Sequence, residues 1–164
     1  MYWAKLLEIF CPNSTKRVIG FDAFRPFSEL PLRQEEHGIA ESHDKIVRGV
    51  SEAEVAAAVE TAGMSRWVRL VKGGIENTAA EYAQRNIGTR ISLLHLDLDT
   101  YSGTKAALVS FYPIVSRGGI IILDEYGVSG MGETDAVDEF FAGTEIRAMA
   151  VPYAEAPTAY IIKS

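Results

Sequence analysis

The chain has 164 residues, of which 48% are hydrophobic and 23% are charged, and its formal net charge is −6. This composition excludes a disordered chain and a collagen-like repeat, and the acidic balance argues against a broad nucleic-acid surface. The single cysteine, Cys11, cannot form an internal disulfide. Since domains commonly contain roughly 100–150 residues, the length predicts one domain over residues 1–164.

Neither a signal peptide nor a membrane span is predicted. Glu8 interrupts the apolar run near the N-terminus, and no apolar stretch reaches the roughly 18 residues of a membrane-spanning helix. We therefore expect a cytoplasmic location, with neither a membrane nor a nucleic acid as partner.

Strand-like and helix-like segments alternate along the chain, which favours an α/β fold with a mostly parallel sheet. Ser51 and Glu54 have the spacing of a capping box, which marks the start of a helix. The elements predicted in the first half are a helix over 3–10, a strand over 17–22, a long loop over 23–50, a helix over 51–63 and a strand over 67–72. A loop of that length is usually a lid, a binding loop or a disordered segment.

The second half begins with a further capping box, in which Thr78 and Glu81 predict a helix that starts at Thr78 and ends near Arg85. The near-continuous apolar run over 91–97 indicates a strand that is buried on both faces. The remaining predicted elements are a helix over 103–112, a strand over 120–124, a helix over 134–141 and two final strands over 145–151 and 158–163.

Carboxylates follow three of the predicted strands. The ligand crevice of an open parallel sheet lies at the carboxyl ends of its strands, and repulsion between acids gathered there is offset by a cation or by ligand hydroxyls. Oxygen ligands in this number suit Mg²⁺ or Ca²⁺. For any one of these acids, a strand that simply ends at the solvent is an equally good explanation. The residues concerned are Asp22, Asp97, Asp99, Asp124 and Glu125.

Two catalytic alternatives fit the sequence less well. The string Asp97-Leu98-Asp99-Thr100 has a faint similarity to the strand-end aspartates of haloacid-dehalogenase-type phosphatases, which are Mg²⁺-dependent phosphohydrolases. In that family a threonine falls four residues after the first aspartate, whereas Thr100 falls three after Asp97. Nucleophilic catalysis is not favoured, because the chain has no GxSxG motif and Cys11 precedes every predicted strand.

One block of motifs is more specific than the rest. It contains an Asp-x-Asp-x-Tyr, a Tyr-Pro, a Gly-Gly and a strand that ends in two acids before a tyrosine, formed by Asp97, Asp99, Tyr101, Tyr112, Pro113, Gly118, Gly119, Asp124, Glu125 and Tyr126. This block resembles the macrocin O-methyltransferase family, a branch of the class I S-adenosylmethionine-dependent methyltransferases that act on sugars of natural products and glycans. The segments 20–24 and 72–73 match the same family more weakly.

The resemblance implies a Rossmann-like three-layer sandwich with a mostly parallel sheet and a C-terminal antiparallel strand. It also implies S-adenosylmethionine as cofactor and a hydroxyl of a sugar or glycosylated small molecule as methyl acceptor. The implied cofactor-binding residues are Asp22, which would bind the ribose hydroxyls, Gly73 and Asp97. The implied catalytic residues are Asp97, near the methyl-transfer centre, and Asp99.

A divalent cation, Mg²⁺ or another, is implied at Asp99, Asp124 and Glu125, although the family more often has aspartate where this chain has Glu125. His95 shares a strand face with Asp97, since strand side chains alternate, and is a candidate base. A hydrogen-bonded core histidine is the favoured interpretation of His95.

The resemblance also implies that the first strand of the fold and its glycine-rich turn are missing, because residues 2–10 look like the helix that follows them. The missing strand would lie between the strands predicted over 17–22 and 91–97. We therefore expect an N-terminally truncated domain with an incomplete cofactor site, which is inactive alone and exposes strand edges that favour homo-oligomers. A non-catalytic, self-associating Rossmann-like module is the alternative.

Overall fold

The computed structural model describes all residues from Met1 to Ser164. Its α-helices are α1 (Tyr2–Phe10), α2 (His37–Ile46), α3 (Glu52–Thr61), α4 (Ile75–Arg85), α5 (Tyr101–Phe111) and α6 (Glu133–Phe140). Its strands are β1 (Val18–Asp22), β2 (Val68–Lys72), β3 (Ile91–Leu96), β4 (Val115–Leu123), β5 (Met149–Ala150) and β6 (Ala159–Ile162). Three short 3-10 helices are η1 (Phe27–Glu29), η2 (Gln34–Glu36) and η3 (Tyr112–Ile114).

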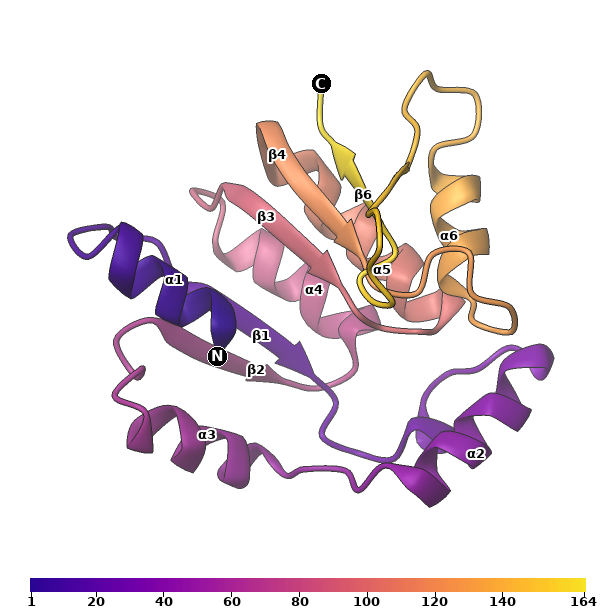
Figure 1. Ribbon diagram of the computed structural model, residues 1–164, viewed down its shortest axis with the longest axis horizontal. Coiled ribbons are helices and arrows are strands. Elements are labelled where there is room, and N and C mark those ends of the chain that lie inside the picture. The colour runs from indigo at the N-terminus through magenta and orange to yellow at the C-terminus, as the bar shows by residue number, and fades with distance from the viewer.

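The strands form two separate sheets. One contains the parallel pair β1–β2, and the other has the order β3-β4-β6-β5. Strands β3 and β4 are parallel, whereas β6 runs antiparallel to both of its neighbours, so the expected C-terminal antiparallel strand is confirmed. No strand pairs with the inner edge of β1 or of β3, which lie on either side of the gap in Figure 1. This gap is where the family resemblance implies the missing strand.

Helices lie on both faces of β1–β2, which confirms the three-layer arrangement there (Figure 1). Helices α1 and α3 share a small core with this sheet, built around Ala4, Val59, Met64 and Trp67. On the opposite face, the Phe21 ring of β1 packs against aromatic rings of α4 and α5. Because strand side chains alternate, successive residues of β1 pack against the helices on opposite faces of the sheet.

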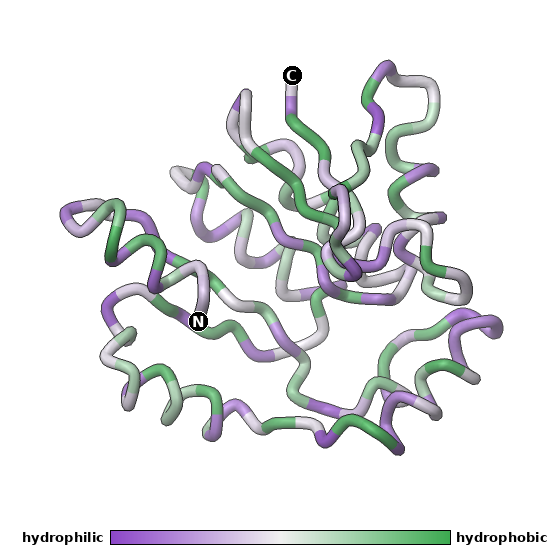
Figure 2. Tube along the Cα trace, viewed as in Figure 1, coloured by the Kyte–Doolittle hydropathy of each residue, from purple (hydrophilic) through white to green (hydrophobic).

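The larger core lies between the second sheet and helices α4, α5 and α6. Leu96, Leu108, Ile121, Leu123 and Ile161 are its most deeply buried large side chains. The apolar composition of β4 and β6 is visible in Figure 2. The face of this sheet that points away from the core is also apolar: Ile120 and Ile162, which are register partners, are 37% and 48% exposed.

The predicted loop over 23–50 is wrong for much of its length, because it contains η1, η2 and α2. Local hydrogen bonds stabilise these short elements in place of a sustained apolar period. Asp44 of α2 accepts bonds from the backbone N–H groups of Phe27 and Ser28, both at 2.9 Å. The hydrogen bond from the Ser28 side chain, together with these two backbone donors, lowers the pKa of Asp44 to about 2.

The capping box of α3 is confirmed, since Ser51 and Glu54 bond to each other's backbone N–H groups. The second predicted capping box, at Thr78 and Glu81, is wrong. Helix α4 begins at Ile75 with Gly74 as N-cap, and the Thr78 hydroxyl donates to the Gly74 carbonyl at 3.1 Å. Helix α6 begins at Glu133, and the Thr134 hydroxyl accepts from the backbone N–H of residue 127.

Four further elements have boundaries that differ from the predictions. Helix α5 begins two residues early, at Tyr101, because the Thr100 side chain caps it. Strand β4 begins at Val115, before the glycine pair, and the two final strands are shorter than predicted. No helix combines the length and the apolar character that crossing a bilayer would require.

Candidate active site

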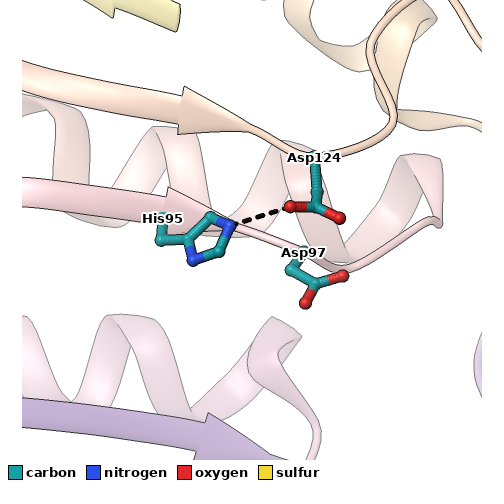
Figure 3. Close-up of side chains that lie close together, drawn as sticks. All are labelled: His95, Asp97 and Asp124. Carbon is teal, nitrogen blue, oxygen red and sulfur yellow. Dashed lines mark hydrogen bonds and ion pairs between the residues drawn. The ribbon is translucent and has the colours of Figure 1, made fainter. Parts of the chain in front are cut away.

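The carboxyl ends of β3 and β4 bring three ligand-type side chains together. These strands are parallel, with Leu96 and Leu123 as register partners, so Asp97 and Asp124 follow at neighbouring positions. His95 projects from β3 beside them (Figure 3). One ligand atom from each of His95, Asp97 and Asp124 lies within 4.8 Å of the other two. Such a set of two carboxylates and one imidazole is able to hold a divalent cation.

His95 is fixed by a direct contact with Asp124. The distance from His95 Nε2 to Asp124 Oδ1 is 3.0 Å, and the two side chains are 31% and 17% exposed. The Trp3 ring of α1 lies edge-on to the imidazole, with 6.2 Å between ring centroids. The predicted hydrogen bond of His95 is thus present, but its predicted core position is wrong. Leu94 and Leu96 alternate with it and take the buried face of β3.

The neighbouring carboxylates repel one another. Partial burial raises the pKa of Asp97, and the charges of Asp124 and Asp22 raise it further, against the opposing effect of His95. Burial also raises the pKa of Asp99 to about 6, with additional contributions from Asp97 and Glu125. Nearby negative charge disfavours the ionised carboxylate, so a bound cation would lower both pKa values and relieve the repulsion.

Glu133 lies behind this cluster and is completely buried. Its Oε1 accepts a hydrogen bond of 3.1 Å from the backbone N–H of Glu125, while its Oε2 has no hydrogen-bond partner. Burial raises the pKa of Glu133 to about 8, although the bond from Glu125 opposes this shift. Its surroundings therefore favour the neutral form, and its Oε1 anchors the backbone at Glu125, two residues after β4.

A cavity of about 170 Å³ lies beside the cluster, lined from both sheets. The three predicted cofactor-binding residues, Asp22, Gly73 and Asp97, all line it, and so does Asp99. Gly73 has a φ of +134°, and an added Cβ would lie 2.8 Å from Thr78 Cγ2. Its N–H donates to the Asp22 carbonyl at 2.9 Å, so a glycine is needed where the chain leaves β2. A larger cavity, of about 450 Å³ between α6 and β6, contains none of the strand-end carboxylates.

The predicted metal set is distributed around the cluster. Asp124 has a ligand atom within 4.8 Å of those of His95 and Asp97. Asp99 and Glu125 are outside this group, but burial and the charges of Asp97 and Asp124 raise the pKa of both. Asp99 lies in the turn between β3 and α5, with a φ of +58°. The assignment of Asp99, Asp124 and Glu125 as metal ligands stays a prediction.

Sequence reasoning missed two buried acids at the site, Glu36 and Glu133. Glu36 is 2% exposed although it lies within the predicted loop, and its Oε1 accepts from the backbone N–H of Tyr101 at 2.7 Å. Its position three residues after Arg33 follows the spacing of a capping box, which is the one signal for it in the sequence. Glu133 resembles an ordinary acid in the first turn of a helix.

Comparison with solved structures assigns the fold to a class. The chain superposes on the calicheamicin methyltransferase CalS11 with a TM-score of 0.77 and 24% identity, covering 98% of this chain and 65% of that one. For the O-methyltransferase NovP the TM-score is 0.78 and the identity 23%, covering 99% of this chain and 65% of that one. The fold is therefore that of the methyltransferases, and the chain spans about 65% of the length of these relatives.

A family model narrows this class. The model of macrocin O-methyltransferase (TylF) matches residues 9–152, so the chain belongs to that family, as the sequence motifs predict. A second structure of CalS11, described as a TDP-rhamnose 3'-O-methyltransferase of calicheamicin biosynthesis, is 28% identical, with a TM-score of 0.69. That comparison covers 98% of this chain and 64% of the other. None of the curated proteins matches this chain.

Proposed function

We propose that this chain forms part of an S-adenosylmethionine-dependent methyltransferase that methylates a hydroxyl of a sugar or glycoside with the help of a divalent cation. The observation that carries the proposal is the cavity shared by Asp22, Gly73 and Asp97, which opens beside the cluster of Asp97 with His95 and Asp124. A cofactor site next to a cation site is what such a reaction requires. Membership of the macrocin O-methyltransferase family favours this chemistry over phosphate-ester hydrolysis.

The cavity has groups that suit the cofactor. Asp22 is the last residue of β1 and its side chain is exposed, so the carboxylate is available to accept hydrogen bonds from ribose hydroxyls. Gly73 allows the backbone to approach a ligand without a side chain in the way. Asp97 lines the cavity and also belongs to the cation cluster, so it joins the two parts of the site.

The acidic cluster suits a divalent cation, because the carboxylates raise one another's pKa and no Lys or Arg side chain forms an ion pair with Asp97, Asp99, Asp124 or Glu125. A cation bound there would lower the pKa of an acceptor hydroxyl and orient it. Asp124, together with the predicted ligands Asp99 and Glu125, would hold the cation. His95 would keep the Asp124 carboxylate in place.

Positioning contributes most of the acceleration in a displacement at a methyl group. Here Asp22 ends β1 and Gly73 follows β2 in one sheet, whereas Asp97 and Asp124 follow β3 and β4 in the other. The relative placement of the two sheets therefore sets the distance between the methyl donor and the acceptor. A cavity of about 170 Å³ is smaller than the roughly 300–1,000 Å³ of common ligand sites, which supports an incomplete cofactor site.

Calorimetric titration with S-adenosylmethionine, in the presence and absence of Mg²⁺, tests the cofactor site. We expect weak binding that Asp22→Asn weakens further, with Asp138→Asn as control, because Asp138 bonds to Tyr126 outside the cavity. Micromolar binding would overturn the proposed incompleteness. Binding that is equally affected by both substitutions would contradict the assignment of Asp22.

Titration with Mg²⁺ or Ca²⁺ tests the cation site separately. We expect Asp124→Asn and Asp99→Asn each to weaken binding by about tenfold or more, since each removes a charge from the cluster. Asp138→Asn again serves as control. Unaltered affinity in both cluster variants would remove the cation from the proposal.

A second candidate is a self-associating module without catalytic activity. It is supported by the unpaired inner edges of β1 and β3 and by the exposed pair Ile120 and Ile162. Open strand edges and apolar sheet faces both promote association between chains. Light scattering over a concentration series should then show dimers or larger species, and a monomer at every concentration would exclude this candidate.

A further inference from the structure

Glu36 is a buried carboxylate that no cation neutralises. It is 2% exposed and forms no ion pair, while the nearby Arg33 guanidinium pairs with Asp135 at 3.0 Å. A carboxylate buried in this way is costly unless it accepts good hydrogen bonds. Its two oxygens accept from two backbone N–H groups, that of Arg33 at 2.6 Å and that of Tyr101 at 2.7 Å.

The bond to Tyr101 joins two elements that are distant in the sequence. Tyr101 is the first residue of α5, and the N–H groups of a first helical turn have no partner within the helix. The Thr100 side chain accepts from Gly103, and Glu36 accepts from Tyr101, so two different residues satisfy the start of α5. The positive end of the helix dipole also stabilises the negative charge of Glu36.

This contact lies next to the turn that presents Asp99. The left-handed φ of +58° at Asp99 is unfavourable for a residue with a side chain, so neighbouring contacts must hold it. The Asp99 carbonyl accepts from Gly132 at 2.7 Å, and Glu36 fixes Tyr101 two residues further on. A Cβ at Gly132 would overlap both Glu36 Oε1 and the Tyr101 nitrogen, so these groups are in close contact.

Glu36 also belongs to a folded segment rather than a free loop. It ends η2 and precedes α2, and Asp44 of α2 holds the backbone of η1. The Arg33 guanidinium lies 3.2 Å from the centroid of the Tyr101 ring, which adds a second contact between this segment and α5. The segment 27–46 therefore contacts the start of α5, next to the turn that contains Asp99.

We propose that Glu36 is a positioning residue that fixes the backbone at Asp99 and so couples the segment 27–46 to the carboxylate cluster. The inference rests on the proposed function for the consequence of this coupling, which is the cation affinity. It does not rest on that function for the contact itself. Displacing Glu36 should therefore change both the turn at Asp99 and the binding of a cation.

The test compares Glu36→Gln with Glu35→Gln. The substituted amide would offer one carbonyl oxygen to two N–H donors, whereas the neighbouring Glu35 side chain is 63% exposed and serves as the matched control. The amide signals of Asp99 and Tyr101 are followed by nuclear magnetic resonance, and Mn²⁺ affinity is measured by titration. We expect Glu36→Gln to shift both signals and to weaken Mn²⁺ binding by roughly 10- to 100-fold, with neither effect in Glu35→Gln.

Glu36→Asp keeps the charge but shortens the side chain by one methylene, so the carboxylate no longer spans both N–H donors. This variant carries the test if Glu36→Gln does not fold. Unshifted amide signals in a folded variant would overturn the contact, and shifted signals with unchanged Mn²⁺ affinity would overturn the coupling. Failure of the wild-type chain to bind Mn²⁺ would overturn the coupling and the proposed cation site, while the amide signals would still test the contact.

Discussion

At the scale of single residues, the carboxylates of this protein differ in which protonation state their surroundings favour. Asp44 accepts several hydrogen bonds, which favour its charged form and lower its pKa. Asp99 is half-buried and Glu133 is buried, both near other acids, which favours the neutral form and raises their pKa values to about 6 and about 8. The first arrangement is suited to joining backbone segments, and the second to a site that receives a cation.

The raised pKa values predict how stability depends on pH. Between about pH 4 and pH 8 the folded state binds more protons at Asp99 and Glu133 than the unfolded state does, so the free energy of unfolding should fall as pH rises. The thermal midpoint, measured by circular dichroism without divalent cations, should therefore be lower at pH 8 than at pH 5. Glu133→Gln should flatten the upper part of this dependence. A midpoint that rises across the same range would contradict the prediction.

At the scale of elements, the capping box of α3 allows a direct test of stability. The Ser51 hydroxyl accepts from the Glu54 N–H, and the Glu54 carboxylate accepts from the Ser51 N–H at 2.9 Å. Ser51→Ala should lower the free energy of unfolding by about 1 kcal/mol, as measured by chemical denaturation. Ser42→Ala is the control, because the exposed Ser42 hydroxyl lies within α2 and bonds only to the preceding turn.

Most elements of the sheet core were predictable because their residues follow simple periods. The strands over 17–22, 67–72 and 91–97 correspond to β1, β2 and β3 within one or two residues. Helix α2 was not predictable in this way, since its stability depends on tertiary hydrogen bonds such as those of Asp44. The capping box predicted at Thr78 failed because the Thr78 hydroxyl donates to the Gly74 carbonyl instead.

The candidate site was predictable to a similar degree. Strand-end acids indicate where a parallel sheet binds its ligand, and Asp22 and Asp97 do line one cavity. The burial of Glu36 and Glu133 was not predictable, because it depends on which helix end or strand end each side chain meets in three dimensions. The sequence pattern does not contain that information.

At the scale of the whole molecule, the two sheets are stabilised by cores of different size. Four buried residues, with Trp67 and Met64 the largest, support β1–β2, whereas thirteen support the second sheet. Regions with less buried apolar surface open at lower cost. Amide hydrogen exchange should therefore be faster in β2 than in β4. Equal protection in the two strands would show that the sheets unfold as one unit.

The gap between β1 and β3 also affects how a bound ligand would change the stability of the protein. The Phe21 ring of β1 packs against aromatic rings of α4 and α5, but no backbone hydrogen bonds pair β1 with β3. A small molecule bound by both Asp22 and Asp97 would hold the two sheets together, because the sheets could separate only after the molecule had dissociated. Occupancy would then raise resistance to heat and to proteolysis together, in proportion to the logarithm of ligand concentration once the site is nearly full.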